Sequence, residues 1–354
     1  MHFADRNVWS QTLQRAWLKR GLLAVCLLPV TALYALLSAV RRWLYRHAWL
    51  ETCSLNVPVI VVGNLVAGGA GKTPSVIAIV ELLRRRGFTP GIVSRGYAGS
   101  AQSILEVQVD TPPAACGDEP KLLQLRTGAP VVVGRNRVAA GRELLRRHAQ
   151  VNVLVSDDGL QHHRLARDAQ VIVFDERGAG NGWLLPSGPL REPIPSACPA
   201  RSVVLYNAPS PTTHWPGSTA QRSLAGIVEL KAWWQGSNAI AQPAQSLRGR
   251  RLLAVAGIAN PDRFFNMLRD LGLAFEPMPL PDHYPFINLP WPDSEVDVVI
   301  TEKDAVKIDP RRVGDARVWV AALDFRTSPS FESALMLLLP KFPVQGVDHG
   351  SASA

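Results

Sequence analysis

Cysteines and charged residues are scarce in this sequence, and each scarcity excludes a class of protein. The four cysteines, Cys26, Cys53, Cys116 and Cys198, form no CxxC pair, so neither a zinc site nor a disulfide framework is expected, and a reducing cytosol suits the chain best. Charged residues make up 19% of the chain and apolar residues 47%. A buried core can therefore offset the entropy lost on folding, which excludes a disordered regulator.

Acidic residues are also outnumbered, with 29 Asp and Glu against 38 Lys and Arg and a net charge of +9. This excess favours an anionic partner, such as nucleic acid, anionic lipid or a phosphorylated substrate. The basic residues form short scattered clusters without interleaved aromatic residues, so no nucleic-acid partner is expected. Nothing in the sequence implies an obligate protein partner. The length of 354 residues suggests two domains at about 150 residues each.

A stretch of twenty residues without a formal charge lies between Arg20 and Arg41. A helix of this length can cross the hydrocarbon core of a bilayer. Pro29 and Thr31 weaken that interpretation, and basic residues on both flanks also suit a helix lying on an anionic leaflet. A cleaved signal peptide is disfavoured because no cleavage site follows the run. We predict that residues 1–50 associate with a membrane, spanning it or lying on it; a buried core helix is the alternative.

Beyond this segment, short apolar runs alternate with helical stretches, a pattern typical of parallel strands joined by crossover helices. The sequence predicts a doubly wound, P-loop-type α/β core over residues 51–200. Its five strands are expected at 57–63, 89–94, 129–134, 151–157 and 169–175, with helices after Thr73, around 119–125 and over 137–148.

A Gly- and Pro-rich stretch at 178–199 is too irregular for a helix or strand and predicts a functional loop or hinge. After it, the run RSVVLYN opens a second set of strand and helix patterns. We therefore predict a smaller α/β domain over 201–345, followed by a frayed tail at 346–354.

The first predicted strand leads directly into a loop of small residues, Gly68, Gly69, Ala70 and Gly71, and then into Lys72, Thr73 and a helix. Such a loop lets backbone N–H groups close around phosphate oxygens, while the lysine can bridge the β and γ phosphates of ATP and the threonine hydroxyl can ligate Mg²⁺. The contracted pattern GGxGKT is complete, although Val66 stands where the longer pattern requires glycine. We interpret this as a variant P-loop; a glycine-rich turn with a chance Lys-Thr pair is the alternative.

Acidic residues occupy two further places where catalytic groups are expected. Asp157 and Asp158 end an apolar strand, where P-loop enzymes hold Mg²⁺, but an Asp-Asp-Gly turn is the alternative. Asp118 and Glu119 stand at a loop-to-helix junction, where a helix cap and a first-turn acid are equally expected. His283 lies beside an acid in a second-domain loop and is ambiguous in isolation.

Taken together, seven motifs in this order resemble the tetraacyldisaccharide 4'-kinases of lipid A biosynthesis. They are VGNLVAGGAGKTP (62–74), SRGY (94–97), GDEP (117–120), DDGLQH (157–162), GNGWLLPSGPLREP (180–193), DHYPF (282–286) and TEKDAVK (301–307). The resemblance implies transfer of the γ-phosphoryl group of ATP to the 4'-hydroxyl of an acylated glucosamine disaccharide 1-phosphate, giving lipid IVA. It also implies two α/β/α domains with a cleft between them and a place at the cytoplasmic face of the bacterial inner membrane.

The resemblance further implies roles for single residues. Asp118 would accept the proton of the sugar hydroxyl, with His283 paired to it, and Lys72 would act with Mg²⁺ on the β and γ oxygens. Thr73 and either Asp157 or Asp158 would hold the metal.

Four residues are weaker candidates for binding the acceptor or a phosphate group. By the resemblance, Arg191 and Glu192 in the long loop would close on the site. Arg135 and Arg137 are further candidates for grasping a phosphate of the acceptor or nucleotide.

The competing hypothesis is a P-loop ATPase that acts as a membrane-associated switch or partitioning protein. Such ATPases often carry a lysine where Ala67 stands here, and the motifs GDEP and DHYPF would be unexplained. The two hypotheses differ in whether ATP consumption requires an acylated disaccharide. The adenine contacts stay open, since Thr301 is equally expected to cap a helix.

Overall fold

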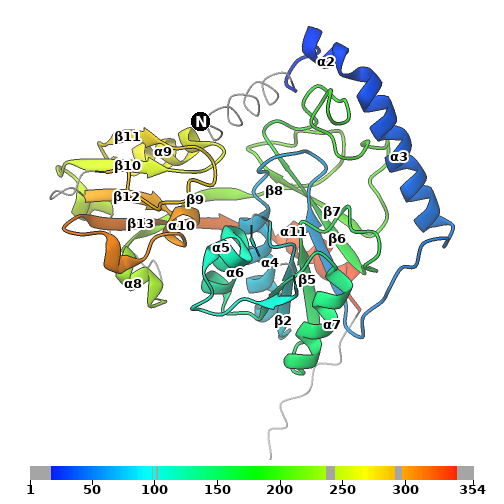
Figure 1. Ribbon diagram of the computed structural model, residues 1–354, viewed down its shortest axis with the longest axis horizontal. Helices are drawn as coiled ribbons and strands as arrows, with labels where there is room; N and C mark the ends of the chain where they lie inside the picture. Colours follow the sequence, from blue (N-terminus) through cyan, green and yellow to red (C-terminus); the bar gives the residue numbers. More distant parts are fainter. Residues whose placement is uncertain (1–16, 98, 101–102, 237–243, 292–296, 341–354) are drawn as a thin grey trace, which may run out of the picture.

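The computed structural model describes residues 17–340, apart from 98, 101–102, 237–243 and 292–296. It contains two β-sheets, an eight-stranded sheet and a five-stranded sheet, which lie side by side and are flanked by helices (Figure 1). The predicted frayed tail at 346–354 lies outside the described residues.

The eight-stranded sheet has the order β3-β4-β2-β5-β1-β6-β7-β8, and all of its neighbouring strands run parallel except β3 and β4. Its central strands β1, β2 and β5 are buried along their whole length because helices cover both faces of the sheet. The strands are β1 (Val59–Gly63), β2 (Pro90–Ser94), β3 (Leu105–Glu106), β4 (Val131–Val133), β5 (Val153–Asp157), β6 (Ala169–Asp175), β7 (Ser202–Asn207) and β8 (Ser218–Thr219). The five strands predicted for this core are confirmed.

The helices of the large sheet divide between its two faces, as a doubly wound fold requires. One face packs against α4 (Lys72–Arg85), α6 (Asp118–Thr127) and α11 (Pro329–Leu338) through a core that includes Ile79, Leu123 and Phe331. The other face packs against α7 (Arg137–Arg147) through Leu144. The short helix α5 (Pro113–Cys116) precedes α6. The predicted fold class is confirmed.

The five-stranded sheet has the order β11-β10-β12-β13-β9, with β9 antiparallel to β13. Its strands are β9 (Gln221–Glu229), β10 (Leu252–Ala256), β11 (Glu276–Pro279), β12 (Asp297–Thr301) and β13 (Arg317–Arg326). Its helices are α8 (Leu230–Trp234), α9 (Pro261–Asp270) and α10 (Glu302–Ala305), with the short 3-10 helices η1 (Ala244–Leu247) and η2 (Pro310–Arg312). The strand β13 serves both parts, because Val320 belongs to the core of this sheet whereas Phe325 packs against the core of the large one.

The prediction that RSVVLYN opens the smaller domain is wrong. This run forms β7, which pairs in parallel with β6 and belongs to the large sheet. The helix α11, also predicted within 201–345, packs on β6 and β7. The Gly- and Pro-rich loop at 178–199 is therefore a wide connection inside one sheet rather than the boundary between two.

Within residues 17–50, the structure describes two helices, α2 (Leu22–Cys26) and α3 (Leu28–Arg46), which run along the outside of the large-sheet part (Figure 1). Pro29 occupies the first turn of α3, where it needs no hydrogen-bond acceptor. The inner face of α3 is fixed to the long loop: the hydroxyl groups of Thr31 and Ser187 lie 2.7 Å apart, and the Tyr34 hydroxyl donates to the carbonyl of Arg191 at 2.8 Å. The helix α3 therefore docks on the loop that precedes β7.

The outer face of these helices consists of exposed apolar side chains. Leu22 is 85% exposed, and Leu33, Leu36 and Leu37 are each about 60% exposed. A core helix would bury such residues, so the buried-helix alternative does not describe this face. Within the described part of the chain, no helix has both the length and the apolarity needed to cross a membrane.

Candidate active site

The phosphate loop connects β1 to α4 and is shaped by two glycines in left-handed backbone conformations. Gly68 has φ +98° and Gly71 has φ +84°, which side chains other than glycine rarely adopt. The Asn207 amide donates to the carbonyl of Ala70 at 3.1 Å, and a Cβ atom on Gly71 would overlap that amide. The strand β7, which ends at Asn207, thus supports the loop from behind.

Lys72 and Thr73 begin α4, and Lys72 faces Asp158, which directly follows β5. The Lys72 ammonium lies 3.6 Å from Asp158 Oδ1 and donates to Asn64 Oδ1 at 3.5 Å. Thr73 is buried against the wall of a cavity that the loop and helix share with the smaller sheet. The strand, loop, lysine and threonine therefore occur in the arrangement that the sequence pattern predicted.

Asp157 and Asp158 differ in their surroundings although they are neighbours in the chain. Asp157 is buried and accepts a hydrogen bond from the Ser94 hydroxyl at 3.0 Å, while its Oδ1 atom has no hydrogen-bond partner within the described residues. Burial raises the pKa of Asp157, and the charges of Glu119 and Asp158 add to this, against the opposing effect of Lys72. Burial also acts to raise the pKa of Asp158, but Lys72 and Arg191 outweigh it and hold that pKa below its ordinary value.

Two of the four weaker candidates reach Asp158. Arg191 Nη1 lies 3.0 Å from Asp158 Oδ1, so the long loop is fixed to the end of β5. Arg137 is buried and donates to the Asp158 carbonyl at 3.4 Å. By contrast, Arg135 is exposed between β4 and α7, and Glu192 points into a different cavity.

The predicted Asp118–His283 pair is present and joins the two parts of the molecule. Asp118 begins α6 after Gly117, whose φ of +94° fits only glycine easily. His283 lies in the loop after β11 with a positive φ of +59°. The His283 Nδ1 atom is 3.0 Å from Asp118 Oδ2. Residues 165 positions apart therefore make a hydrogen bond at the junction of the two sheets.

A cavity of about 360 Å³ opens between the phosphate loop and the smaller sheet. The large-sheet part contributes the phosphate loop, Lys72, Thr73 and Glu119, and the smaller part contributes charged and apolar side chains. Those from the smaller part include Arg222, Leu224, Arg263, Phe264, Met267, Lys303 and Leu323. A nucleotide whose phosphates lie on the loop would extend into this space.

The sequence analysis did not predict three arginines that lie near the phosphate loop. Arg177 donates to the carbonyls of Ala67 and Gly69, each at 3.3 Å, and pairs with Asp175. Arg222 and Arg263 line the cavity from the smaller part. The sequence did hold a signal for the region of Arg177, because the strand run AQVIVFD (β6) ends in an acid at the same sheet edge as VNVLVSD (β5). The elements β9 and α9, which carry Arg222 and Arg263, show no such signal.

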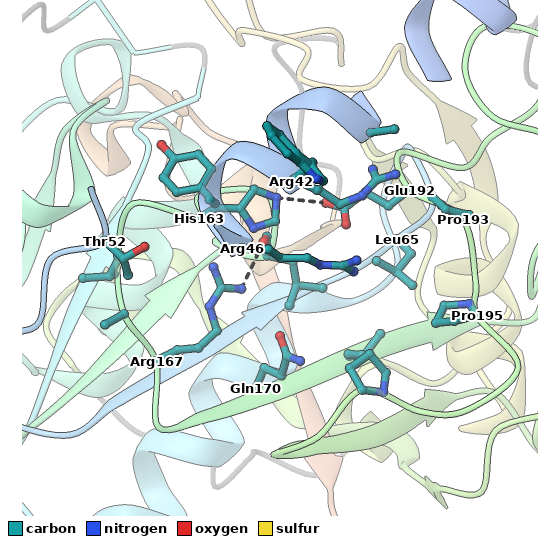
Figure 2. A pocket seen from close by; sticks show the side chains of 18 of the residues that line it. Arg42, Arg46, Thr52, Leu65, His163, Arg167, Gln170, Glu192, Pro193 and Pro195 are labelled. Carbon is teal, nitrogen blue, oxygen red and sulfur yellow. Dashed lines mark hydrogen bonds and ion pairs between the residues drawn. The ribbon is translucent and has the colours of Figure 1, made fainter. Parts of the chain in front are cut away.

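A second and larger cavity, of about 1070 Å³, lies between the C-terminal half of α3 and the large sheet (Figure 2). Its walls are mainly apolar, but Arg42, Arg46 and Arg167 also line it. In Figure 2, His163 and Glu192 point toward each other, with His163 Nε2 3.8 Å from Glu192 Oε1. Burial, reinforced by nearby arginines, lowers the pKa of His163 to about 4, so the ring is neutral at pH 7.

Comparison with known proteins assigns the chain to a family. The family model described as tetraacyldisaccharide-1-P 4'-kinase matches residues 23–339. The chain belongs to this family. It is 54% identical to the tetraacyldisaccharide 4'-kinase of Leptothrix cholodnii, over 95% of this chain and 97% of that protein. It is 53% identical to the tetraacyldisaccharide 4'-kinase of Methylibium petroleiphilum, over 91% and 92%.

The fold of the chain is also similar to that of a solved structure. A crystal structure of LpxK from Aquifex aeolicus in complex with ATP matches with a TM-score of 0.75 at 26% identity, covering 90% of this chain and 100% of that chain. The family resemblance inferred from the seven motifs is thus confirmed.

Proposed function

We propose that this protein transfers the γ-phosphoryl group of ATP to the 4'-hydroxyl of tetraacyldisaccharide 1-phosphate, giving lipid IVA in lipid A biosynthesis. Membership of the tetraacyldisaccharide 4'-kinase family supports this activity. The observation that carries it is the placement of two groups of residues at one junction. The phosphate loop with Lys72 borders the cavity between the two sheets, and the Asp118–His283 pair bridges the same two parts.

In this proposal the nucleotide phosphates lie on Gly68, Gly69, Ala70 and Gly71, as ATP does in P-loop proteins generally. Lys72 neutralises negative charge on the β and γ oxygens as the bond to the leaving group breaks. The ATP-bound structure of the Aquifex aeolicus relative supports nucleotide binding by this fold. Arg222 and Arg263 would contact the part of the nucleotide that extends into the cavity.

Asp118 accepts the proton of the sugar hydroxyl in the proposed reaction, and His283 holds the carboxylate in place. An ordinary carboxylate is a weak base for an alcohol, but in a loose phosphoryl-transfer transition state the proton leaves late. Orientation therefore matters more than basicity. The 3.0 Å contact to His283 Nδ1 restricts the rotation of the Asp118 side chain and so supplies orientation.

The residues at the end of β5 fit a Mg²⁺ ion. Asp157 Oδ1 is a buried carboxylate oxygen without a protein partner among the described residues, and Asp158 and the Thr73 hydroxyl offer further oxygen atoms. In the described part of the chain, no group of three or more His, Cys, Asp or Glu side chains is placed so that it could hold a metal ion by itself. Mg²⁺ does not need one, since it usually binds one or two carboxylates together with substrate phosphates. When bound, the ion would offset charge on the β and γ phosphates.

The cavity beneath α3 is the proposed place for the lipid part of the acceptor. It is large and mainly apolar, and Glu192 and three arginines give it a polar fringe that suits a phosphorylated sugar with acyl chains. Arg191 connects this side of the molecule to Asp158. Arg137 would support Asp158 from its buried position rather than grasp a phosphate. Arg135, which is exposed, is still proposed to contact a phosphate of the acceptor or nucleotide.

The exposed face of α2 and α3 is the proposed contact with the cytoplasmic leaflet of the inner membrane. Its leucines would enter the interface while Arg41, Arg42 and Arg46 attract anionic headgroups. A lipid acceptor stays partly embedded in the bilayer, so docking raises its effective concentration at the active site.

Replacing Leu33, Leu36 and Leu37 together by glutamate should release the protein from membranes without unfolding it, because these side chains are exposed. We expect flotation with anionic liposomes to fall at least about tenfold, because charged side chains would replace leucines that enter the membrane interface. ATP affinity should be unchanged. Deleting residues 1–50 is a less specific test, because α3 holds the loop that carries Arg191.

The matched control is Leu337→Glu in α11, which is 83% exposed but lies on another element. This control should float with liposomes as well as the unaltered protein does. Equal flotation of the triple variant and the control would place the membrane affinity elsewhere and contradict the proposed docking face.

The activity is tested by incubating the protein with ATP labelled at the γ-phosphate, Mg²⁺ and acylated disaccharide 1-phosphate in mixed micelles. We expect the label to appear in a bisphosphorylated lipid, and ATP consumption without the acceptor to be at least about a hundredfold slower, because phosphoryl transfer requires a positioned nucleophile. ATP hydrolysis that proceeds equally well without the disaccharide would instead support the membrane-associated ATPase.

A further inference from the structure

The Lys303 side chain lies behind His283, on the side away from Asp118. Its Nζ atom is 3.4 Å from His283 Nε2, 3.4 Å from Asp282 Oδ1 and 3.5 Å from Glu119 Oε1. An ammonium group has three N–H donors and no acceptor. Lys303 therefore donates to His283 Nε2 and Asp282 and forms an ion pair with Glu119. His283 is held between Asp118 on one side and Lys303 with Asp282 on the other.

The backbone around this cluster is fixed by a buried carboxylate. Asp304 accepts hydrogen bonds from the Gly257 N–H at 2.9 Å and from the Thr301 hydroxyl at 2.8 Å, and Lys307 Nζ lies 2.7 Å from its other oxygen. The Gly257 carbonyl in turn accepts from the His283 N–H at 3.2 Å. The element carrying Lys303 and the loop carrying His283 are thus both fixed to Gly257, the residue that follows β10.

This arrangement determines which ring nitrogen of His283 carries the proton. In a neutral imidazole one nitrogen donates and the other accepts. Because Lys303 can only donate, Nε2 must accept, and the proton must be on Nδ1, where it donates to Asp118. We propose that Lys303 is a positioning residue that fixes His283 as the neutral Nδ1–H tautomer and thereby directs one oxygen of Asp118.

Lys303 carries its positive charge where it faces the His283 ring. The carboxylates that act on Lys303 are Glu119 and Asp282, which form ion pairs with it, and Asp118, which acts at longer range. Asp282 Oδ2 also lies 3.9 Å from His283 Nε2. Burial acts to lower the pKa of Lys303, but these three carboxylates together hold it above its ordinary value, so the lysine is charged at neutral pH. His283 Nε2 thus faces a group that can only donate, which is the contact that the Nδ1–H tautomer accepts.

The positioning role of Lys303 matters for the proposed reaction because the other tautomer of His283, protonated at Nε2, would disturb Asp118. With the proton on Nε2, the unprotonated Nδ1 would face the Asp118 carboxylate, and two lone pairs would repel each other. Asp118 would then lose the hydrogen bond that orients it toward the sugar hydroxyl. This inference rests on the proposed role of Asp118 as the base, so it is tested both with and without catalysis.

The first test observes the tautomer by NMR, using protein labelled with ¹⁵N in histidine rings and a His283→Gln variant to assign the signals. In the unaltered protein we expect His283 Nδ1 to be protonated and Nε2 to be bare. In Lys303→Met, which removes the donor, the Nε2–H form should appear, and Lys303→Arg, which keeps a donor, should restore the original state. A protonated Nε2 in the unaltered protein, or a spectrum unchanged in Lys303→Met, would overturn the proposal.

The second test is kinetic and separates this role from a direct phosphate contact, since Lys303 also borders the cavity between the sheets. We expect Lys303→Met to lower kcat by roughly 10- to 100-fold with the KM for ATP within about threefold, and Lys303→Arg to recover most of the loss. In a His283→Ala background the same substitution should cost less than about threefold, because the residue through which it acts is gone.

The possible outcomes have distinct meanings. A large rise in the KM for ATP, with the tautomer unchanged, would assign Lys303 to the nucleotide and overturn the positioning role. If the tautomer shifts as expected but Asp118→Asn retains full activity, the positioning of His283 stands and the proposed base fails. Equal losses in the presence and absence of His283 would show that Lys303 acts independently of the ring.

Discussion

Substitution of Lys72 by alanine is expected to lower kcat by about three orders of magnitude or more, because the lysine neutralises charge that develops in the transition state. In the structure its ammonium lies at the start of α4, 3.6 Å from Asp158 and beside the phosphate loop. Loss of the side chain removes the charge but leaves the backbone N–H groups of the loop. ATP binding should weaken far less than turnover, which a nucleotide titration alongside steady-state kinetics would measure.

The control for this variant is Arg85→Ala, at the opposite end of the same helix. Arg85 is exposed and pairs with Glu332 at 2.8 Å, so its removal subtracts one positive charge from α4 without touching the site. Its kcat should stay within about twofold, since surface ion pairs contribute little. Near-normal turnover in a folded Lys72→Ala protein would contradict the assignment of the phosphate loop.

Asp118→Asn is the second change with a large expected effect. The amide keeps the size of the carboxylate but cannot take up the hydroxyl proton, so kcat should fall by about 10²- to 10⁴-fold while the KM for ATP changes little. His283→Ala should have a smaller effect in the same direction, because it removes orientation rather than the acceptor. Asp262→Asn, which alters an exposed acid in the first turn of α9, is the matched control and should leave kcat unchanged.

The double variant tests whether Asp118 and His283 work as one unit. Residues that act together are non-additive, so adding His283→Ala to Asp118→Asn should cost little beyond the single Asp118 change. A double variant that loses the full product of the two single effects would show that the residues act independently.

The sequence was most informative where one local pattern determines both structure and chemistry. An apolar strand, a loop of small residues and a Lys-Thr pair can be arranged in few ways, so the phosphate loop and the nearby acids at the end of β5 were predictable. The position of β7 was not. Its strand pattern is plain, but which sheet it joins depends on pairing with β6 across twenty-six intervening residues (176–201), and the Gly- and Pro-rich composition of that connection suggested a boundary instead.

The Asp118–His283 contact could not be predicted from a local sequence pattern at all. No spacing rule joins residues on α6 to a loop of a different sheet, so only resemblance to a family could pair them. The cavity residues Arg222 and Arg263 were missed for the same reason, because β9 and α9 approach the phosphate loop only through the packing of the two sheets. Such contacts depend on tertiary structure, which local patterns do not encode.

The antiparallel strands β9 and β13 carry the chain out to the smaller sheet and back, so everything between them is an insertion into the larger unit. Cutting the chain near residue 200 would therefore not separate two folding units, because β7, β8 and α11 would be lost from the large sheet. A two-stranded ribbon resists stretching through its hydrogen bonds but twists readily. Any rocking of the inserted part would turn about this ribbon, and the spacing between Asp118 and His283 would change with the angle.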